Sequence, residues 1–125
     1  MTAYIMLCSG SLMSIFWGVA HIIPTKPVVK GFGKISEDNR RIIQMEWIAE
    51  GLTLCFLGAL VLLITITAGA ANTVSFLVYR ASAAMLLVMA GLTAVTGART
   101  ALIPIKICPV VKVVIAGLFF LGSVV

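Results

Sequence analysis

Four long runs of apolar residues follow one another along the chain, separated by segments that are polar or rich in turn residues. The runs cover residues 3–23, 42–67, 73–95 and 107–125. Each run has about the 20 residues that a helix needs to cross a bilayer. None alternates apolar and polar residues as the strands of a membrane β-barrel do. The pattern predicts an all-α fold: an integral membrane four-helix bundle in a single domain.

The segments between the runs contain signals that end one helix and begin the next. Pro24 and Pro27 follow the first run, and we expect them to end its helix and to begin a loop over residues 24–41. Ser36 is placed to cap the second helix, because its hydroxyl can accept a hydrogen bond from the free amides of the first turn. Pro109 interrupts the start of the fourth run.

The composition supports a lipid environment. Hydrophobic residues make up 62% of the chain and charged residues 10%, whereas soluble domains have about 45–50% and about 25%. With a mean hydropathy of +1.19, the chain has too few polar side chains to cover a surface in water. The start of the chain lacks the basic segment of a signal peptide, so we expect no cleavage there.

The basic residues predict an orientation. Their excess gives a net charge of +5, but they lie mainly between the runs, so we expect no nucleic-acid partner. Two loops contain most of them, whereas neither terminus nor the turn after the second run contains any; the loop residues are Lys26, Lys30, Lys34, Arg40, Arg41, Arg99 and Lys106. Basic loops stay in the cytoplasm. We therefore expect a bacterial inner-membrane protein with both termini outside the cytoplasm.

Ionisable side chains inside the runs are costly in lipid, so each one is a candidate functional residue. They form a candidate polar cluster of His21, Glu46, Glu50, Arg80 and Lys112. Glu46 and Glu50 share one helix face. Two carboxylates this close can share a proton, which suits proton transfer or cation binding. Alternatively, Glu46 lies at the interface and Glu50 pairs with Arg80, Lys112 or His21.

The other candidates have structural alternatives as well. His21 shares a face with Gly10, Ser14 and Gly18, a small-residue stripe suited to close helix packing, so we expect it to point into the bundle. There it can relay a proton or cap a helix end. Arg80 and Lys112 can instead extend toward lipid headgroups.

Cys108 is a possible reactive thiol, because it lies near two lysines at a predicted helix start. The alternative is that it packs as a small apolar residue. No His or Cys residues are spaced as metal ligands, so we expect no metal site.

The start of the second run has a recognisable sequence. Residues 46–54 read Glu-Trp-Ile-Ala-Glu-Gly-Leu-Thr-Leu, and Leu-Gly-Ala-Leu follows at residues 57–60. This segment resembles the second span of the DoxX-like small four-helix membrane proteins. The resemblance implies a small membrane subunit, linked in some members to quinone or sulfur redox chemistry. The basic entry at residues 38–41 and the uncharged turn after the second run depart from the family's pattern.

Three functions remain open. The first is an accessory or redox-associated subunit that binds a quinone or another lipid-like ligand between its helices. The second is a proton-coupled small-molecule transporter that acts as an oligomer, with Glu46 and Glu50 as its acidic pair. The third is a membrane-embedded enzyme that uses His21 and these glutamates as acid and base. The expected partners are the lipid bilayer and either further copies of the chain or another membrane subunit.

Overall fold

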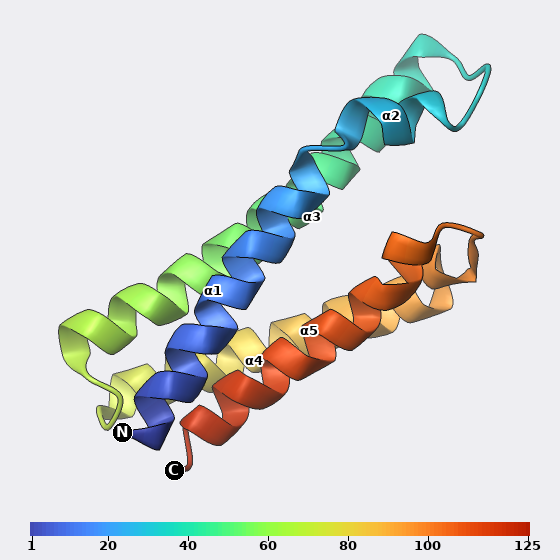
Figure 1. The fold of residues 1–125 in the computed structure, drawn as a ribbon. Coiled ribbons are helices and arrows are strands. Elements are labelled where there is room, and N and C mark those ends of the chain that lie inside the picture. Colours follow the sequence, from blue (N-terminus) through green and yellow to red (C-terminus); the bar gives the residue numbers. More distant parts are fainter.

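The computed structural model describes residues 1–125 as helices and connecting loops, without strands (Figure 1). The helices are α1 (Thr2–Ile22), α2 (Thr25–Lys30), α3 (Glu37–Ala68), α4 (Thr73–Val95), the short 3-10 helix η1 (Gly97–Arg99) and α5 (Ile103–Gly122). α1, α3 and α5 are long and apolar enough to cross a membrane, and so is the segment Thr73–Arg99 that contains α4. The predicted all-α four-helix bundle is confirmed, and the chain is a multi-pass membrane protein.

The first helix ends before Pro24, as the sequence predicts, but Pro27 and Pro109 disturb the helices less than it predicts. Residues 24–41 are not only a loop, because they contain α2, which has Pro27 in its first turn. Proline is tolerated there, since the first amides of a helix have no partner within the helix. α5 begins at Ile103, before the expected start, with Pro104 in its first turn, and the helix continues through Pro109. The Ser36 cap is present, and its hydroxyl accepts a hydrogen bond from Asn39 N at 3.2 Å.

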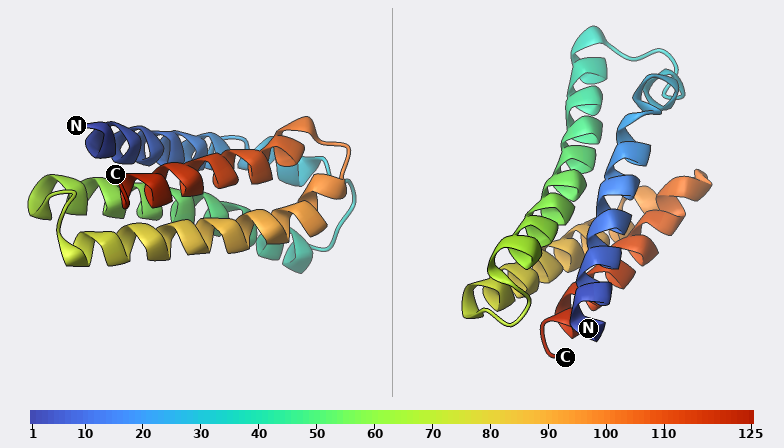
Figure 2. Two further views of the ribbon diagram at one scale, coloured as in Figure 1. Left: turned by 90° about the horizontal axis from the view of Figure 1, so that it is seen from below. Right: turned by 60° about the vertical axis from the view of Figure 1, so that its left-hand side comes forward.

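The helices are arranged as two pairs. α1 packs along α3, and α4 packs along α5, while contacts of α1 with α5 and of α3 with α4 join the pairs. The pairs lie close together at the end that contains both termini and the turn Gly69–Asn72, and they diverge toward the other end (Figures 1 and 2). We call the first the terminal end. We call the second, with residues 23–41 and 96–106, the basic end, because it contains every Lys and Arg except Arg80 and Lys112.

Small residues hold α1 and α3 together. An added Cβ on Gly18 would lie 2.6 Å from the carbonyl oxygen of Gly51, and one on Gly58 would lie 2.6 Å from that of Ser11. The two backbones therefore approach as closely as small residues allow. Ser14 adds a hydrogen bond across the contact, from its Oγ to the Leu54 carbonyl at 2.7 Å. This contact fixes the position of α3, which supplies the main residue of the site.

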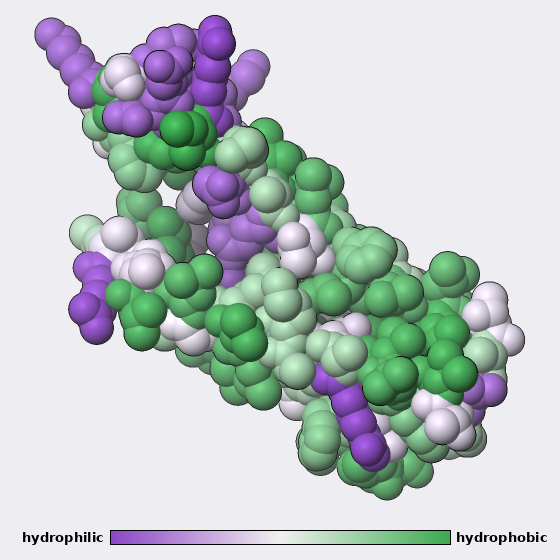
Figure 3. Space-filling model, turned by 180° about the vertical axis from the view of Figure 1, so that it is seen from behind, coloured by the Kyte–Doolittle hydropathy of each residue, from purple (hydrophilic) through white to green (hydrophobic).

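The outward faces of the long helices are apolar. Large side chains such as Phe16, Leu77 and Val88 are mostly exposed. Figure 3 shows this apolar surface on the helices, with hydrophilic side chains gathered at one end and in the opening between the diverging pairs. Exposed apolar surface of this extent is suited to contact with lipid tails.

Candidate functional site

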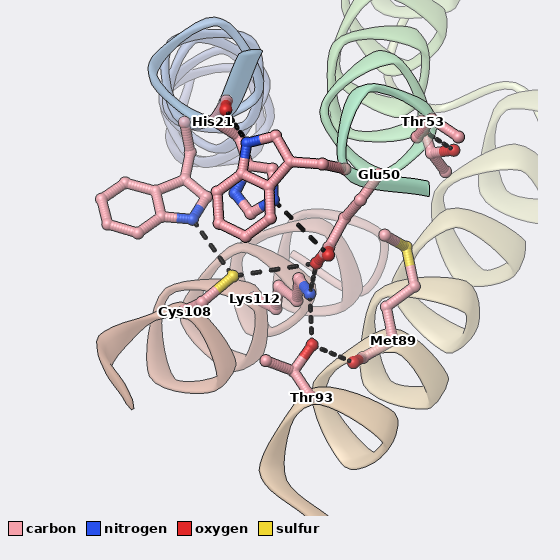
Figure 4. Close-up of polar contacts among 10 residues, drawn as sticks. His21, Glu50, Thr53, Met89, Thr93, Cys108 and Lys112 are labelled. Carbon is pink, nitrogen blue, oxygen red and sulfur yellow. Dashed lines mark hydrogen bonds and ion pairs between the residues drawn. The ribbon is translucent and has the colours of Figure 1, made fainter. Parts of the chain in front are cut away.

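Glu50 lies on α3 near the point where the two helix pairs diverge, and it contacts side chains from α1 and α5 (Figure 4). The ammonium group of Lys112, on α5, forms an ion pair with Glu50 Oε1. The Lys112 Nζ also donates to Thr93 Oγ1 of α4 at 2.7 Å. The Lys112 side chain is 0% exposed and that of Glu50 is 28% exposed. The buried ammonium is thus both neutralised and hydrogen-bonded, as a charge in an apolar interior requires.

His21 approaches Glu50 from α1. Its Nε2 lies 3.6 Å from Glu50 Oε2, and its side chain is 10% exposed. The imidazole stacks on Trp47, with ring centroids 4.0 Å apart and an angle of 17° between the ring planes. The Trp47 indole N–H donates to the His21 carbonyl oxygen. Stacking and this bond hold the imidazole in place, yet its Nε2 is buried without a hydrogen-bond partner.

Cys108 completes the group on the α5 side. Its Sγ donates to Glu50 Oε1 at 3.9 Å and accepts from the Trp17 indole N–H at 3.4 Å. The residue is 2% exposed. We refer to His21, Glu50, Thr93, Cys108 and Lys112 as the Glu50 cluster. A reactive thiol must be accessible to its reactant as well as ionised. The burial of Cys108 therefore argues against its reaction with molecules in solution.

A cavity of about 320 Å³ adjoins the cluster at the basic end. Its lining residues are apolar or aromatic except for His21: Trp17, Ala20, His21, Pro24, Val28, Trp47, Leu102, Pro104 and Ile105. They come from α1, α2, α3 and the start of α5. We call it the aromatic cavity, because both tryptophans of the chain and the stacked imidazole line it. Two lining residues connect the cavity to the Glu50 cluster: Trp17 donates to Cys108, and His21 is itself a member of the cluster.

The structure brings together three of the five ionisable candidates: His21, Glu50 and Lys112. Glu46 lies outside the cluster, exposed and without an ion pair. It is one turn nearer the basic end than Glu50, where the pairs have diverged. Arg80 does not reach Glu50, because its Nε donates at 3.3 Å to Ser123 Oγ at the terminal end.

Three residues of the site were not singled out as candidates from the sequence. Thr93 is an ordinary polar residue in an apolar run, and nothing in its neighbourhood along the chain distinguishes it. Trp17 precedes His21 by one helical turn on the same face of α1, which is a usable signal. Trp47 follows Glu46 and resembles an interfacial anchor, a common position for tryptophan in membrane helices.

Comparison with protein-family models, with curated proteins and with solved structures finds no match to this chain. The site also contains no group of three or more His, Cys, Asp or Glu side chains that could hold a metal ion. Its chemical groups are one ion pair, one imidazole, one thiol and one hydroxyl beside an apolar cavity.

Proposed function

We propose that this protein binds a lipid-soluble ligand with a flat headgroup, such as a quinone, in the aromatic cavity. The observation that supports this most directly is the position of the cavity, apolar and aromatic in lining, beside the buried Glu50 cluster. Binding sites for small molecules combine apolar walls with a few polar groups that orient the ligand. The volume of about 320 Å³ is at the lower end of the range for such sites, which suits a ring more than a whole lipid.

His21 is the side chain that orients the headgroup in this proposal. The indole N–H groups of Trp17 and Trp47 already donate to Cys108 and to the His21 carbonyl. The imidazole is the lining side chain that makes no hydrogen bond, and while its buried Nε2 faces Glu50, its other ring nitrogen, Nδ1, is not among the fully buried atoms. In this proposal Nδ1 binds an oxygen of the ligand in the plane of the ring, while Trp47 stacks on the face of the ring. The resemblance of residues 46–60 to DoxX-like proteins supports an accessory, redox-associated role for such a subunit.

Tryptophan fluorescence tests the proposal, because the chain has only two tryptophans and both line the cavity. A short-chain quinone such as decylubiquinone is added to the purified protein in mild detergent. We expect saturable quenching. Ala20→Phe, which fills the cavity, should abolish the saturable part. The matched control Ala59→Phe, on the exposed face of α3, should leave it unchanged. Quenching that is linear in quinone and equal in all three proteins would exclude a site in this cavity.

We also propose that the basic end lies in the cytoplasm of a bacterial cell and that both termini lie across the inner membrane from it. The support is the distribution of lysine and arginine between the two ends. Reporter fusions after Val125 test the orientation. A reporter active only outside the cytoplasm is expected, and a cytoplasmic signal would contradict the proposed topology.

A further inference from the structure

A series of buried polar side chains extends through the bundle from Glu50 toward the terminal end. Its members are at most 3% exposed and come from three different helices: Ser11 and Ser14 of α1, Thr65 of α3, and Ser75, Tyr79 and Ser82 of α4. We call them the hydroxyl series. All of them present an O–H group, which both donates and accepts a hydrogen bond.

Contacts with α3 place the hydroxyl series at successive depths. Ser14 bonds to the Leu54 carbonyl, Ser11 faces Gly58, and Thr65 shares a hydrogen bond of 2.9 Å with Tyr79. With a rise of 1.5 Å per residue, these levels lie about 6, 12 and 22 Å beyond Glu50.

Two further members lie on α4. Ser82 is three residues from Tyr79 on the side of Glu50, so its level is about 18 Å from Glu50. Ser75 is four residues from Tyr79 in the other direction, at about 28 Å. A hydroxyl therefore occurs at nearly every turn between Glu50 and the terminal end.

Two members of the series have hydroxyl oxygens that are fully buried and lack hydrogen-bond partners. Ser11 Oγ and Ser75 Oγ are fully buried, and neither bonds to another protein atom. An unsatisfied buried hydroxyl costs about 1–3 kcal/mol, and proteins usually satisfy such groups with internal water. At the terminal end, an open cavity of about 630 Å³ is lined in part by Tyr4, Asn72 and Ser123. Its lining includes Phe76, the residue after Ser75 in α4, so the cavity brings water close to this end of the series.

We propose that the hydroxyl series and water at its two fully buried, unpartnered members, Ser11 and Ser75, conduct protons between the terminal-end cavity and Glu50. A proton enters from the cavity and passes along hydroxyls and water to the Glu50 carboxylate, which becomes a neutral carboxylic acid. Protonation removes the counter-ion of Lys112, so this state is short-lived; meanwhile Lys112 keeps its hydrogen bond to Thr93 and can still donate to the unprotonated oxygen of Glu50. The proton leaves through His21, whose Nε2 is 3.6 Å from Glu50 and whose ring lines the aromatic cavity.

The side chains that face the Glu50 carboxylate in this step are His21 of α1 and Cys108 and Lys112 of α5. One proton enters and one leaves, so no other reactant is consumed. The activity does not depend on the proposed ligand, because the path uses residues of the bundle interior and not the cavity walls, apart from His21.

Liposomes that contain the purified protein and a pH-sensitive dye test this activity. A pH difference is imposed with potassium and valinomycin present, so that charge movement does not limit the flux. We expect wild-type protein to carry protons faster than protein-free liposomes allow. Glu50→Gln should lower the flux to the protein-free level, and Tyr79→Phe and Ser11→Ala should each lower it several-fold. Ser9→Ala, at an exposed position of the same helix, should match wild type.

Melting temperatures show whether each variant remains folded. Tyr79→Phe and Ser11→Ala change single hydroxyls, so they keep the test valid if Glu50→Gln fails to fold. Wild-type flux equal to that of protein-free liposomes would overturn the proposal. Equal flux in wild type and both hydroxyl variants would also overturn it, and would show that the hydroxyls of Ser11 and Tyr79 serve packing alone. Quinone quenching in the same preparations reports separately on the aromatic cavity.

Discussion

The contact between α1 and α3 and the contact between α3 and α5 hold helices together in opposite ways. The first uses glycine and serine, with Gly18 and Gly51 bringing two backbones into contact. The second uses the two long charged side chains of Glu50 and Lys112. Lipid tails are as apolar as leucine, so apolar side chains alone give membrane helices little reason to associate. Close packing and polar contacts are the two remaining means.

The location of each contact explains the difference. α1 and α3 run side by side over most of their length, so small residues can keep them close. α3 and α5 belong to different pairs, which diverge toward the basic end. Where backbones separate, only long side chains can reach across, and charged ends provide a strong interaction in a medium of low dielectric constant. The chemistry of the site therefore lies where close packing ends.

The largest effect is expected from removing one member of the ion pair. Glu50→Leu leaves the fully buried Lys112 without a counter-ion, and breaking a buried pair in this way costs about 3–5 kcal/mol. The midpoint of unfolding in a mixed detergent titration measures the loss. Glu46→Leu is the matched control, because Glu46 is exposed and unpaired, and it should change stability by less than about 0.5 kcal/mol.

A double variant sharpens this result. Glu50→Gln combined with Lys112→Met removes both charges and keeps similar volumes, so it should recover most of the stability that Glu50→Leu loses. If the double variant were as unstable as Glu50→Leu, shape and not charge would hold α3 and α5 together. The contrast between the two contacts would then disappear.

A second effect tests the close contact of α1 with α3. Gly18→Leu should cost about 1–3 kcal/mol or somewhat more, as overpacking does, because even a Cβ there would lie 2.6 Å from the Gly51 carbonyl oxygen. Gly91→Leu is the control, since a Cβ at Gly91 meets nothing within 4 Å. Leu12→Ala, on the exposed face of α1, should also cost less than Gly18→Leu. Equal melting temperatures for the two glycine variants would mean that the glycine contact is dispensable.

A smaller effect is expected at Thr93. Thr93→Val keeps the shape of the side chain but removes the acceptor 2.7 Å from Lys112 Nζ. Polar contacts between membrane helices average about 0.6 kcal/mol and reach about 1.7 kcal/mol, so we expect a loss of about 1 kcal/mol. Thr93→Ser should retain it. If Thr93→Val unfolded at the wild-type midpoint, the ion pair with Glu50 would be sufficient to stabilise the buried ammonium of Lys112, and the hydrogen bond to Thr93 would contribute nothing.

The smallest effect is expected at Arg80. It is exposed and donates to Ser123 at 3.3 Å, so Arg80→Gln should change stability by less than about 0.5 kcal/mol. The same unfolding titration measures it. A loss as large as that of Glu50→Leu would show that Arg80 interacts with the interior of the bundle.

The sequence by itself determined the all-α fold, the four apolar helices and the cap of α3 at Ser36, because the signals for each of these are local. A run of apolar residues has the same length whatever surrounds it, and a capping serine lies three residues from the amide that it accepts from. The small-residue stripe of α1 was visible for the same reason, since one helix face can be read from spacing alone.

Only the tertiary structure decided which charges meet. Glu50 forms its ion pair with Lys112, 62 residues away, and not with Arg80. It also does not share a proton with Glu46, which lies outside the cluster. This choice depends on the depth and rotation of each helix and on where the two pairs diverge, none of which is encoded within a single run. The contact of Thr93 with Lys112 and the aromatic cavity also depend on the tertiary structure. The residues that form them come from all four long helices and from α2, and they lie at the same depth in the bundle. Packing between segments that are distant along the chain produces this arrangement.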